Sequence, residues 1–126
     1  MAAILYVDKV FGNRHTSESY KGMIQVVGHS LDTEVNGMVA LDKILRYQYD
    51  LVYMGMEMHD MGGLEFLQRL RDLKQEIPVV VCDIKPDRVG LSIRSGYEPI
   101  IGRCFPMTQD NVFDYLSEID KVTAPN

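Results

Sequence analysis

The 126-residue sequence has no tryptophan, only two cysteines and no long apolar run. Its apolar stretches, such as Ile77 to Cys82, are far shorter than the roughly 20 residues of a membrane-spanning helix, so a membrane protein is not expected. The start of the chain lacks a basic leader and a long apolar segment. Two cysteines do not make a disulfide framework, so Cys82 and Cys104 are expected to be buried thiols in a reducing cytoplasm. A redox pair is the less favoured alternative.

Charge of either sign is also modest, with 13 Lys and Arg against 18 Asp and Glu and a formal net charge of −5. No basic cluster is visible, so nucleic-acid binding by this domain alone is not expected. The hydrophobic fraction of 46% is too high for a disordered chain. One domain over residues 1–122 is expected, followed by a frayed tail at 123–126.

Short apolar runs alternate with longer amphipathic stretches along the whole chain. Four strands are predicted from these runs, at residues 4–7, 51–54, 79–82 and 100–101. A fifth, weak and polar strand that suits a sheet edge is expected at 29–35. Continuous apolar strands that alternate with helices are typical of a parallel sheet covered on both faces. We therefore expect an α/β fold whose functional residues lie at the carboxyl ends of the strands.

The helical stretches each show an apolar face whose residues are mostly three or four positions apart. Thr16 is expected to cap the first helix and Gly28 to end it, and Asn36–Gly37 opens the second. The inward residues of the first three helices are predicted to be Tyr20, Met23, Ile24 and Val27, then Leu41, Ile44 and Leu45, then Leu64, Leu67, Leu70 and Leu73. A fourth helix ends at Gly96 and a fifth starts near Thr108.

The segment from Asp50 to Phe66 reads DLVYMGMEMHDMGGLEF. It resembles the bacterial response-regulator receiver domain, the CheY-like family, whose usual form there is D-L-V-L-L-D-x-x-M-P-x-M-D-G-L-E-L. Shorter matches lie in the family's order elsewhere along the chain, at Ile4–Asp8, at Asn36–Gly37, at Ile77–Val81, and at Gly96 with Arg103 and Phe105. The resemblance implies a flavodoxin-like fold with a five-stranded parallel sheet in the order 2-1-3-4-5 and five helices.

The resemblance also implies a chemistry. Receivers take a phosphoryl group from a histidine kinase onto one aspartate, a carboxylate nucleophile. Two further acidic groups hold Mg²⁺, because a hard cation prefers oxygen ligands. A lysine pairs with the new phosphate, and a Ser or Thr hydroxyl moves to hydrogen-bond it.

Most of these positions are altered in this chain. The phosphoacceptor position falls on Gly55, which has no side chain to phosphorylate. The first acidic position is kept as Asp8, but the second falls on Lys9, which has the opposite charge. The hydroxyl position falls on Asp83 and the lysine on Arg103. The sequence thus predicts a degenerate receiver pocket in which Mg²⁺ binding is lost or weak and no cofactor is bound.

Two further positions of the family also differ. The aromatic switch position falls on Ile100. The proline after the conserved lysine falls on Cys104, and a proline stands instead at Pro106. A cis peptide bond without proline costs about 2.5–4 kcal/mol, so a trans bond or a rearranged loop is expected there.

Several interpretations of the altered pocket stay open. The favoured one is a mutually neutralising cluster of Asp8, Lys9, Asp83 and Arg103. Another is that Lys9 and Arg103 bind an anion in the space left by Gly55. A third moves the phosphoacceptor to Asp60 or Asp83.

Two other features have ordinary explanations. His59, in place of a loop proline, is expected to be an exposed loop residue. The methionines of this segment are expected in part to pack in the core, with an adaptable contact surface as the alternative. They are Met54, Met56, Met58 and Met61.

The leading functional hypothesis is a non-enzymatic, phosphorylation-independent receiver in a two-component pathway, acting as a protein-interaction or dimerisation module. A homodimer would use the face of the fourth helix, fifth strand and fifth helix, with the residues Arg88, Ile93, Arg94, Ile100 and 109–121. One alternative is a phosphoreceiver with a displaced carboxylate. Another is a flavodoxin-like cofactor binder that cradles a phosphate near Gly12, Thr16 and Ser17.

Overall fold

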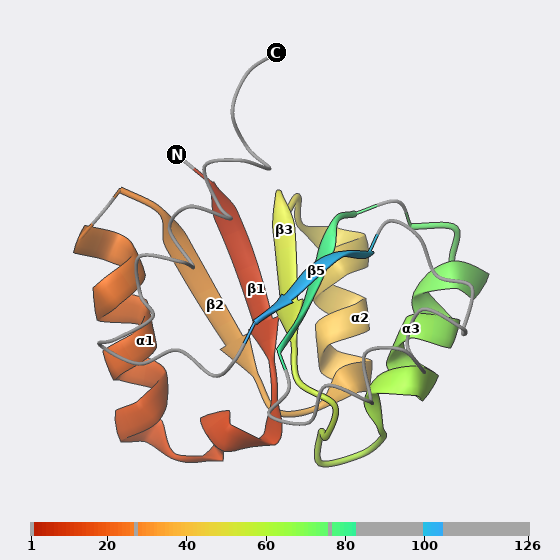
Figure 1. Ribbon diagram of the computed structural model, residues 1–126, viewed down its shortest axis with the longest axis horizontal. Coiled ribbons are helices and arrows are strands. Elements are labelled where there is room, and N and C mark those ends of the chain that lie inside the picture. The colour runs from red at the N-terminus through yellow and green to blue at the C-terminus, as the bar shows by residue number, and fades with distance from the viewer. Residues whose placement is uncertain (1, 27, 76, 83–99, 105–126) are drawn as a thin grey trace.

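A computed structural model describes residues 2–26, 28–75, 77–82 and 100–104 of the chain, the last of these by their backbone. They form a parallel sheet with the strand order β2-β1-β3-β4-β5, the order that the resemblance implies (Figure 1). The strands are β1 (Ala3–Val7), β2 (Ser30–Glu34), β3 (Leu51–Met54), β4 (Val79–Cys82) and β5 (Ile100–Cys104).

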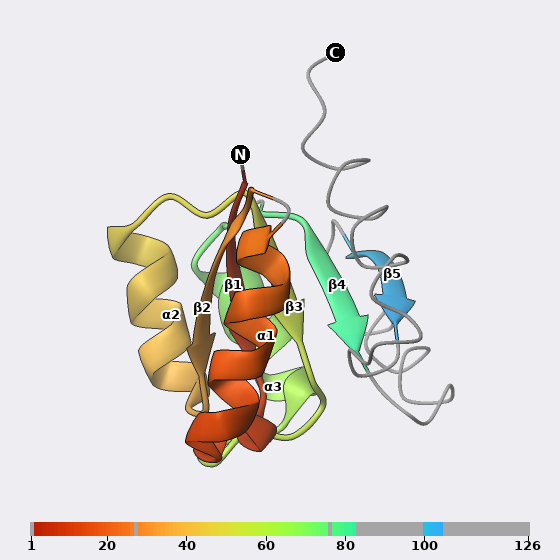
Figure 2. The ribbon, with the colours of Figure 1, turned by 90° about the vertical axis from the view of Figure 1, so that its left-hand side faces the viewer.

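The helices of the described residues lie on both faces of this sheet (Figures 1 and 2). A 3₁₀ helix η1 (Lys9–Gly12) leads into α1 (Arg14–Val26) on one face. The helices α2 (Gly37–Arg46) and α3 (Gly63–Asp72) cover the other face. The expected fourth and fifth helices, the tail at 123–126 and most of the expected dimer face lie outside the described residues.

The strands are buried on both faces because successive side chains point to opposite sides of the sheet. In β1, Leu5 and Val7 pack with α2 and α3, whereas Ile4 and Tyr6 pack with α1. All four are at most 1% exposed. Continuous apolar strands are thus explained by a sheet that has a helical layer on each side.

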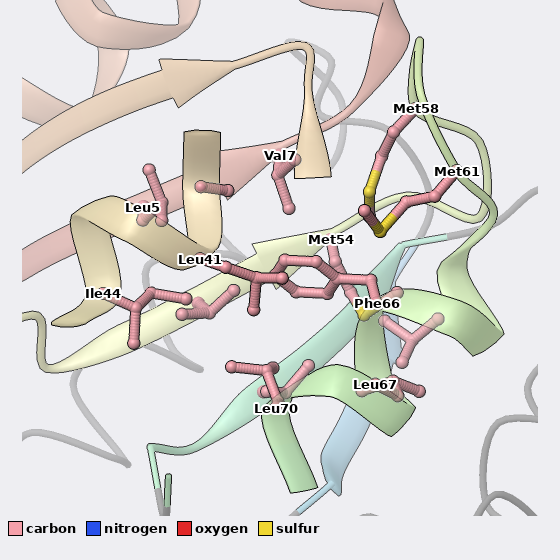
Figure 3. Close-up of a cluster of buried hydrophobic side chains, with 14 residues drawn as sticks. Leu5, Val7, Leu41, Ile44, Met54, Met58, Met61, Phe66, Leu67 and Leu70 are labelled. Carbon is pink, nitrogen blue, oxygen red and sulfur yellow. The ribbon is translucent and has the colours of Figure 1, made fainter. Parts of the chain in front are cut away.

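The core between α2 and α3 corrects two of the predicted helix faces. Figure 3 shows Leu41 and Ile44 of α2 facing Phe66, Leu67 and Leu70 of α3. Phe66 is buried on the inward face of α3, whereas Leu64 and Leu73, which were expected on that face, are not. Three residues predicted to point inward are exposed, because each lies at the margin of its helix face: Leu45 (55%), Leu64 (38%) and Leu73 (40%).

The start of α1 lies three residues earlier than predicted. The side chain of Asn13, not Thr16, caps this helix, because its Oδ1 accepts hydrogen bonds from the backbone N–H of His15 (2.9 Å) and of Thr16 (3.3 Å). The segment expected as a loop before it contains η1. Gly28 follows α1 with a φ of +88°, a conformation that glycine adopts without strain, which agrees with its predicted role as a stop.

The edge strand β2 is polar, and side chains from its neighbours hold it in place. The hydroxyl of Tyr49 donates to Asp32 Oδ2 at 2.6 Å. Burial, together with this hydrogen bond to a carboxylate, raises the pKa of Tyr49 well above its ordinary value. Lys43 Nζ lies 2.5 Å from Glu34 Oε1. Charged groups of this kind also discourage edge-to-edge pairing with a second sheet.

No helix among the described residues is both long enough and apolar enough to cross a bilayer.

A pair of leucines on α3 tests the corrected helix face. Leu67→Ala should lower the free energy of unfolding by about 2–5 kcal/mol, because Leu67 is fully buried and its loss leaves a cavity. Leu64→Ala on the same helix should cost less than about 1 kcal/mol, because Leu64 is 38% exposed. Urea unfolding of both variants measures the difference. An equal loss of unfolding free energy in the two variants would contradict the assignment of Leu67 to the buried face of α3 and of Leu64 to its exposed face.

Candidate functional site

The candidate site lies where β1 and β3 end, side by side, at the carboxyl edge of the sheet. Asp8 follows the last residue of β1, and Gly55 follows the last residue of β3. The backbone N–H of Gly55 donates to the carbonyl of Val7 at 2.9 Å, which continues the strand pairing by one residue. Two of the predicted site residues are thus brought together by the register of the strands.

The carboxylate of Asp8 fills the space above Gly55. A Cβ atom on residue 55 would lie 2.6 Å from the carboxyl carbon of Asp8 and nearer still to its Oδ2. Real Cβ atoms essentially never make contacts of that kind. Residue 55 therefore accepts a side chain only if Asp8 moves away.

Asp8 is held in this position by its own local role. Its backbone is extended, with φ −166° and ψ 145°, and it is the N-cap of η1. Its Oδ1 accepts a hydrogen bond from the backbone N–H of Val10 at 3.0 Å. Its own N–H donates to the carbonyl of Glu34 at 2.9 Å, which ties the residue to the end of β2. Moving the carboxylate would therefore cost the cap of η1.

Lys9 forms an ion pair with Glu57, and its backbone N–H donates to the Glu57 carbonyl at 3.0 Å. The two side chains are 57% and 49% exposed, so the ion pair itself contributes little to stability. Its consequence is electrostatic, because Lys9 stands at the sequence position where the family resemblance places a metal-binding carboxylate. Glu57 was not a member of the predicted cluster of Asp8, Lys9, Asp83 and Arg103.

The other predicted pocket residues are placed only in part. Asp83 lies outside the described residues. Arg103 is placed by its backbone alone, opposite Val81 on β4, and Ile100 lies opposite Val79. The expected trans bond or rearranged loop at Arg103–Cys104 stays a prediction.

Asp60, in the loop between β3 and α3, caps α2 from a distance. Asn36 stands at the N-cap position of α2 but makes no side-chain cap hydrogen bond. Instead, Asp60 Oδ1 accepts from the N–H of Gly37 at 2.7 Å, and Oδ2 accepts from the N–H of Met38 at 3.0 Å. Desolvation acts to raise the pKa of Asp60, but the hydrogen bonds from Met38 and Gly37 outweigh it and lower the pKa below its ordinary value.

The rest of the loop between β3 and α3 is also anchored. His59 is exposed, as predicted, and its N–H donates to the carbonyl of Val35 at 2.9 Å. Met58 and Met61 are under 10% exposed and turn toward the core (Figure 3), and Met54 is fully buried. Met56 is partly buried against the same cluster. Core packing of the methionines is confirmed, which leaves little of them for a contact surface.

Cys82 corrects the expectation of buried thiols. It is 3% exposed, as expected for a buried cysteine, but it is disulfide-bonded. The pairing of β4 with β5 places the Cα of Cys104 opposite that of Cys82. This register depends on a strand pairing between residues far apart in the sequence, so spacing alone does not reveal it.

The arrangement restricts what chemistry the site can carry out. Within the described part of the chain, no group of three or more His, Cys, Asp or Glu side chains could hold a metal ion. The space that an anion would take between Lys9 and residue 55 contains the Asp8 carboxylate. Sequence reasoning missed Glu57 as the partner of Lys9, although opposite charges just beyond two adjacent parallel strands were a usable signal.

A double-mutant cycle tests the steric link between Asp8 and Gly55. Gly55→Ala should lower the free energy of unfolding by about 1–3 kcal/mol, because the added methyl group displaces the Asp8 carboxylate. In an Asp8→Ala background the same change should cost at least about 1 kcal/mol less, because the obstacle is gone. Urea unfolding of the four proteins gives the coupling.

Gly22→Ala is the matched control for this cycle. Gly22 lies in α1, and a Cβ there would meet nothing within 4 Å, so alanine should be neutral or stabilising by up to about 1 kcal/mol. The steric link is refuted if Gly55→Ala costs the same with and without the Asp8 carboxylate.

The capping role of Asp60 predicts a pH dependence. Asp60→Ala should lower the free energy of unfolding by about 1 kcal/mol at pH 7, because two N–H groups of α2 lose their acceptor. Since folding lowers the pKa of Asp60, this stabilisation is complete above the unfolded pKa of about 3.9. It is lost as the pH falls through the lower pKa of the folded state.

Chemical denaturation of wild type and Asp60→Ala between pH 7 and pH 2 measures whether the difference between their free energies of unfolding disappears at low pH. Asp42→Ala is the control, because Asp42 is an exposed residue of α2 that pairs only at i, i+4 with Arg46, at 3.0 Å, among the contacts described. Its effect should stay near 0.3–0.5 kcal/mol, or roughly a third of the Asp60 effect. A stability gap for Asp60→Ala that persists at pH 2 would argue against the cap.

Comparison with known proteins identifies the family of this chain. Residues 6–90 match the family described as the response regulator receiver domain. A 59-residue stretch is 32% identical to the response regulator ArlR of Staphylococcus aureus and covers 47% of this chain and 26% of that protein. The chain thus spans about a quarter of the length of the curated relatives it matches.

Solved structures give the same fold over nearly the whole chain. The response regulator TrrA of Thermotoga maritima, in complex with Mg²⁺ and BeF, is 28% identical with a TM-score of 0.74, over 97% of this chain and 99% of that one. A two-component response regulator of Clostridium difficile has a TM-score of 0.77 at 19% identity, over 99% and 100% of the two chains. With its sheet order and its family match, this chain belongs to the response-regulator receiver domain family.

Proposed function

We propose that this receiver domain acts in two-component signalling without being phosphorylated, as a protein-interaction module with one fixed conformation. The observation that carries the proposal is the Asp8 carboxylate lying in the space above Gly55. Phosphotransfer to a receiver needs a carboxylate nucleophile at that position, and glycine offers none. The space is also closed to a replacement side chain unless Asp8 moves.

The charges around the site support the same proposal. A receiver that accepts a phosphoryl group needs Mg²⁺ to offset the charge of the phosphoryl oxygens. Here Lys9 places a permanent positive charge beside Glu57 at the corresponding place. A fixed ammonium group repels a divalent cation, so Mg²⁺ binding at this edge is expected to be weak or lost.

The anchored loop supports a fixed conformation rather than a switch. The segment between β3 and α3 is tied to η1 through Glu57, to the end of β2 through the His59 backbone and to α2 through Asp60. A conformational change of this loop would break all three connections together. The module is therefore expected to present one surface permanently to its partner.

The partner is proposed to be a protein, because the exposed apolar side chains gather on one side of the described part. Six of its eight exposed large hydrophobic residues lie on α2 and α3 or at their C-caps: Met38, Val39, Leu45, Tyr47, Leu64 and Leu73. Homodimerisation through the fourth helix, fifth strand and fifth helix remains a proposal, since that face falls mostly outside the described residues.

The two alternative functions have less support. Asp60 already accepts two backbone hydrogen bonds, so phosphorylation there would compete with the cap of α2. For a flavodoxin-like cofactor binder, the N-terminus of α1 would have to bind a phosphate, but Asn13 occupies two of its N–H groups. Asp83 as acceptor remains an untested alternative.

Titration with Mg²⁺ and then beryllofluoride, followed by ¹H–¹⁵N correlation spectra, tests the proposed function. The amide signals of Asp8, Gly55 and Asp60 should not move, because beryllofluoride needs an acceptor carboxylate and a bound Mg²⁺. The T. maritima protein, whose structure contains Mg²⁺ and BeF, is the positive control under the same conditions. Intact mass after treatment with acetyl phosphate should show no added phosphoryl group.

Saturable Mg²⁺-dependent shifts at these residues, or a stable phosphorylated species, would overturn the proposed function. In that case Asp60→Asn, set against Asp42→Asn as a control on α2, would decide whether the displaced acceptor is Asp60.

A further inference from the structure

Cys82 stands at an unusual place for a disulfide-bonded residue. It is the last residue of β4, is 3% exposed and packs in the apolar cluster on the α1 face of the sheet. It is disulfide-bonded, and the chain contains only one other cysteine, Cys104. An intrachain partner of Cys82 must therefore be Cys104.

The strand register is compatible with this bond. The Cα atoms of Cys82 and Cys104 are direct partners in the parallel pairing of β4 with β5. Neighbouring strands lie about 4.8 Å apart, which is within the 4.4–6.8 Å range of Cα separations that a disulfide spans. Residues opposite each other in register also lie on the same face of the sheet.

The bond would enclose a functionally important part of the sequence. Residues 83–103 lie between the two cysteines, and they contain three altered positions of the family pocket: Asp83, Ile100 and Arg103. A covalent loop of roughly 20 residues restricts the unfolded chain and stabilises the closed arrangement. The bond would also join the carboxyl ends of β4 and β5, next to the candidate site.

We propose that Cys82 and Cys104 form a reversible intrachain disulfide, a redox modification site that regulates this receiver domain by fastening β5 to β4. The regulatory part rests on the proposed phosphorylation-independent function, whereas the bond itself does not. The thiol–disulfide balance of the surroundings, rather than phosphorylation, would then regulate the part of the domain that contains β4 and β5.

The reaction is a pair of thiol–disulfide exchanges with a low-molecular-weight disulfide such as oxidised glutathione. One cysteine thiolate attacks the glutathione disulfide, forms a mixed disulfide and expels one glutathione thiolate. The second cysteine thiolate attacks the protein sulfur of the mixed disulfide and expels the other. The two cysteines lose two electrons, oxidised glutathione gains them, and the two cysteine protons end on the two reduced glutathione molecules.

The position of β5 explains how a buried cysteine could react. In the described sheet, β5 is an edge strand that pairs with β4 alone. Local separation of an edge strand disturbs less of the sheet than the opening of a central strand does. We therefore expect exchange to be slow and to depend on local opening, rather than on the exposure of Cys82 in the folded state.

The experiment compares the full chain equilibrated with reduced and with oxidised glutathione. Alkylation in denaturant, followed by intact-mass analysis, should show two modified thiols in the reduced protein and none in the oxidised protein. Peptide mapping should find one cross-link, between Cys82 and Cys104. Re-reduction should restore both thiols, since the proposed bond is reversible.

Two further readouts test the regulatory part. Oxidation should raise the midpoint of thermal unfolding by roughly 5–15 °C, because the bond restricts the unfolded chain. It should also slow amide exchange in β4 and β5 by about fivefold or more, because opening of the edge strand is restricted. Cys82→Ala and Cys104→Ala should each abolish both effects, and two separate variants guard against a folding defect in one of them.

Three results would overturn the proposal: both thiols still alkylated after oxidation, a cross-link between two chains on a non-reducing gel, or a bond that leaves amide exchange unchanged. The beryllofluoride titration is repeated in both redox states. A Mg²⁺-dependent response of the reduced protein would overturn the proposed function and the regulatory part, while the peptide map would still report on the bond.

Discussion

One steric constraint links Asp8 and Gly55. The Asp8 carboxylate can lie where it does because residue 55 has no side chain. The two residues follow adjacent parallel strands, so their Cα atoms are fixed close together by the sheet. Only one of them can place a side chain in the shared space. Because residue 55 is glycine, Asp8 turns into that space and caps η1 through the N–H of Val10.

The neighbouring contacts follow from this arrangement. With η1 starting at Lys9, the Lys9 backbone and side chain both meet Glu57 in the loop after β3. The same loop continues to His59 and Asp60, which fasten it to β2 and α2. Asp8, Lys9 and Glu57 thus occupy this part of the edge of the sheet. Lys9 and Glu57 pair their opposite charges there.

Much of the fold follows from patterns within short segments of sequence. Continuous apolar runs located β1, β3 and β4, and the motif around Gly55 implied the order of the sheet. Local spacing failed where side chains lie at the margin of a helix face, as with Leu45, Leu64 and Leu73. It also failed at the start of α1, where Asn13 and Thr16 are both good caps and only the backbone decides between them.

The site was harder to predict because its contacts join distant segments. Sequence identified Asp8, Lys9 and Gly55 as neighbours, but the direction of the Asp8 side chain depends on the space that Gly55 leaves. The pairing of Lys9 with Glu57 depends on how the loop after β3 folds back. The disulfide at Cys82 depends on which residues β4 and β5 place opposite each other, and no local pattern contains that information.

The distant cap on α2 also bears on the order of folding. The group that satisfies the first N–H donors of α2 is 22 or 23 residues further along the chain, beyond β3. As the chain leaves the ribosome, α2 is therefore synthesised before its capping carboxylate exists. Its first turn has to wait for β3 to pair with β1, so α2 and the loop after β3 are expected to become ordered in one cooperative step.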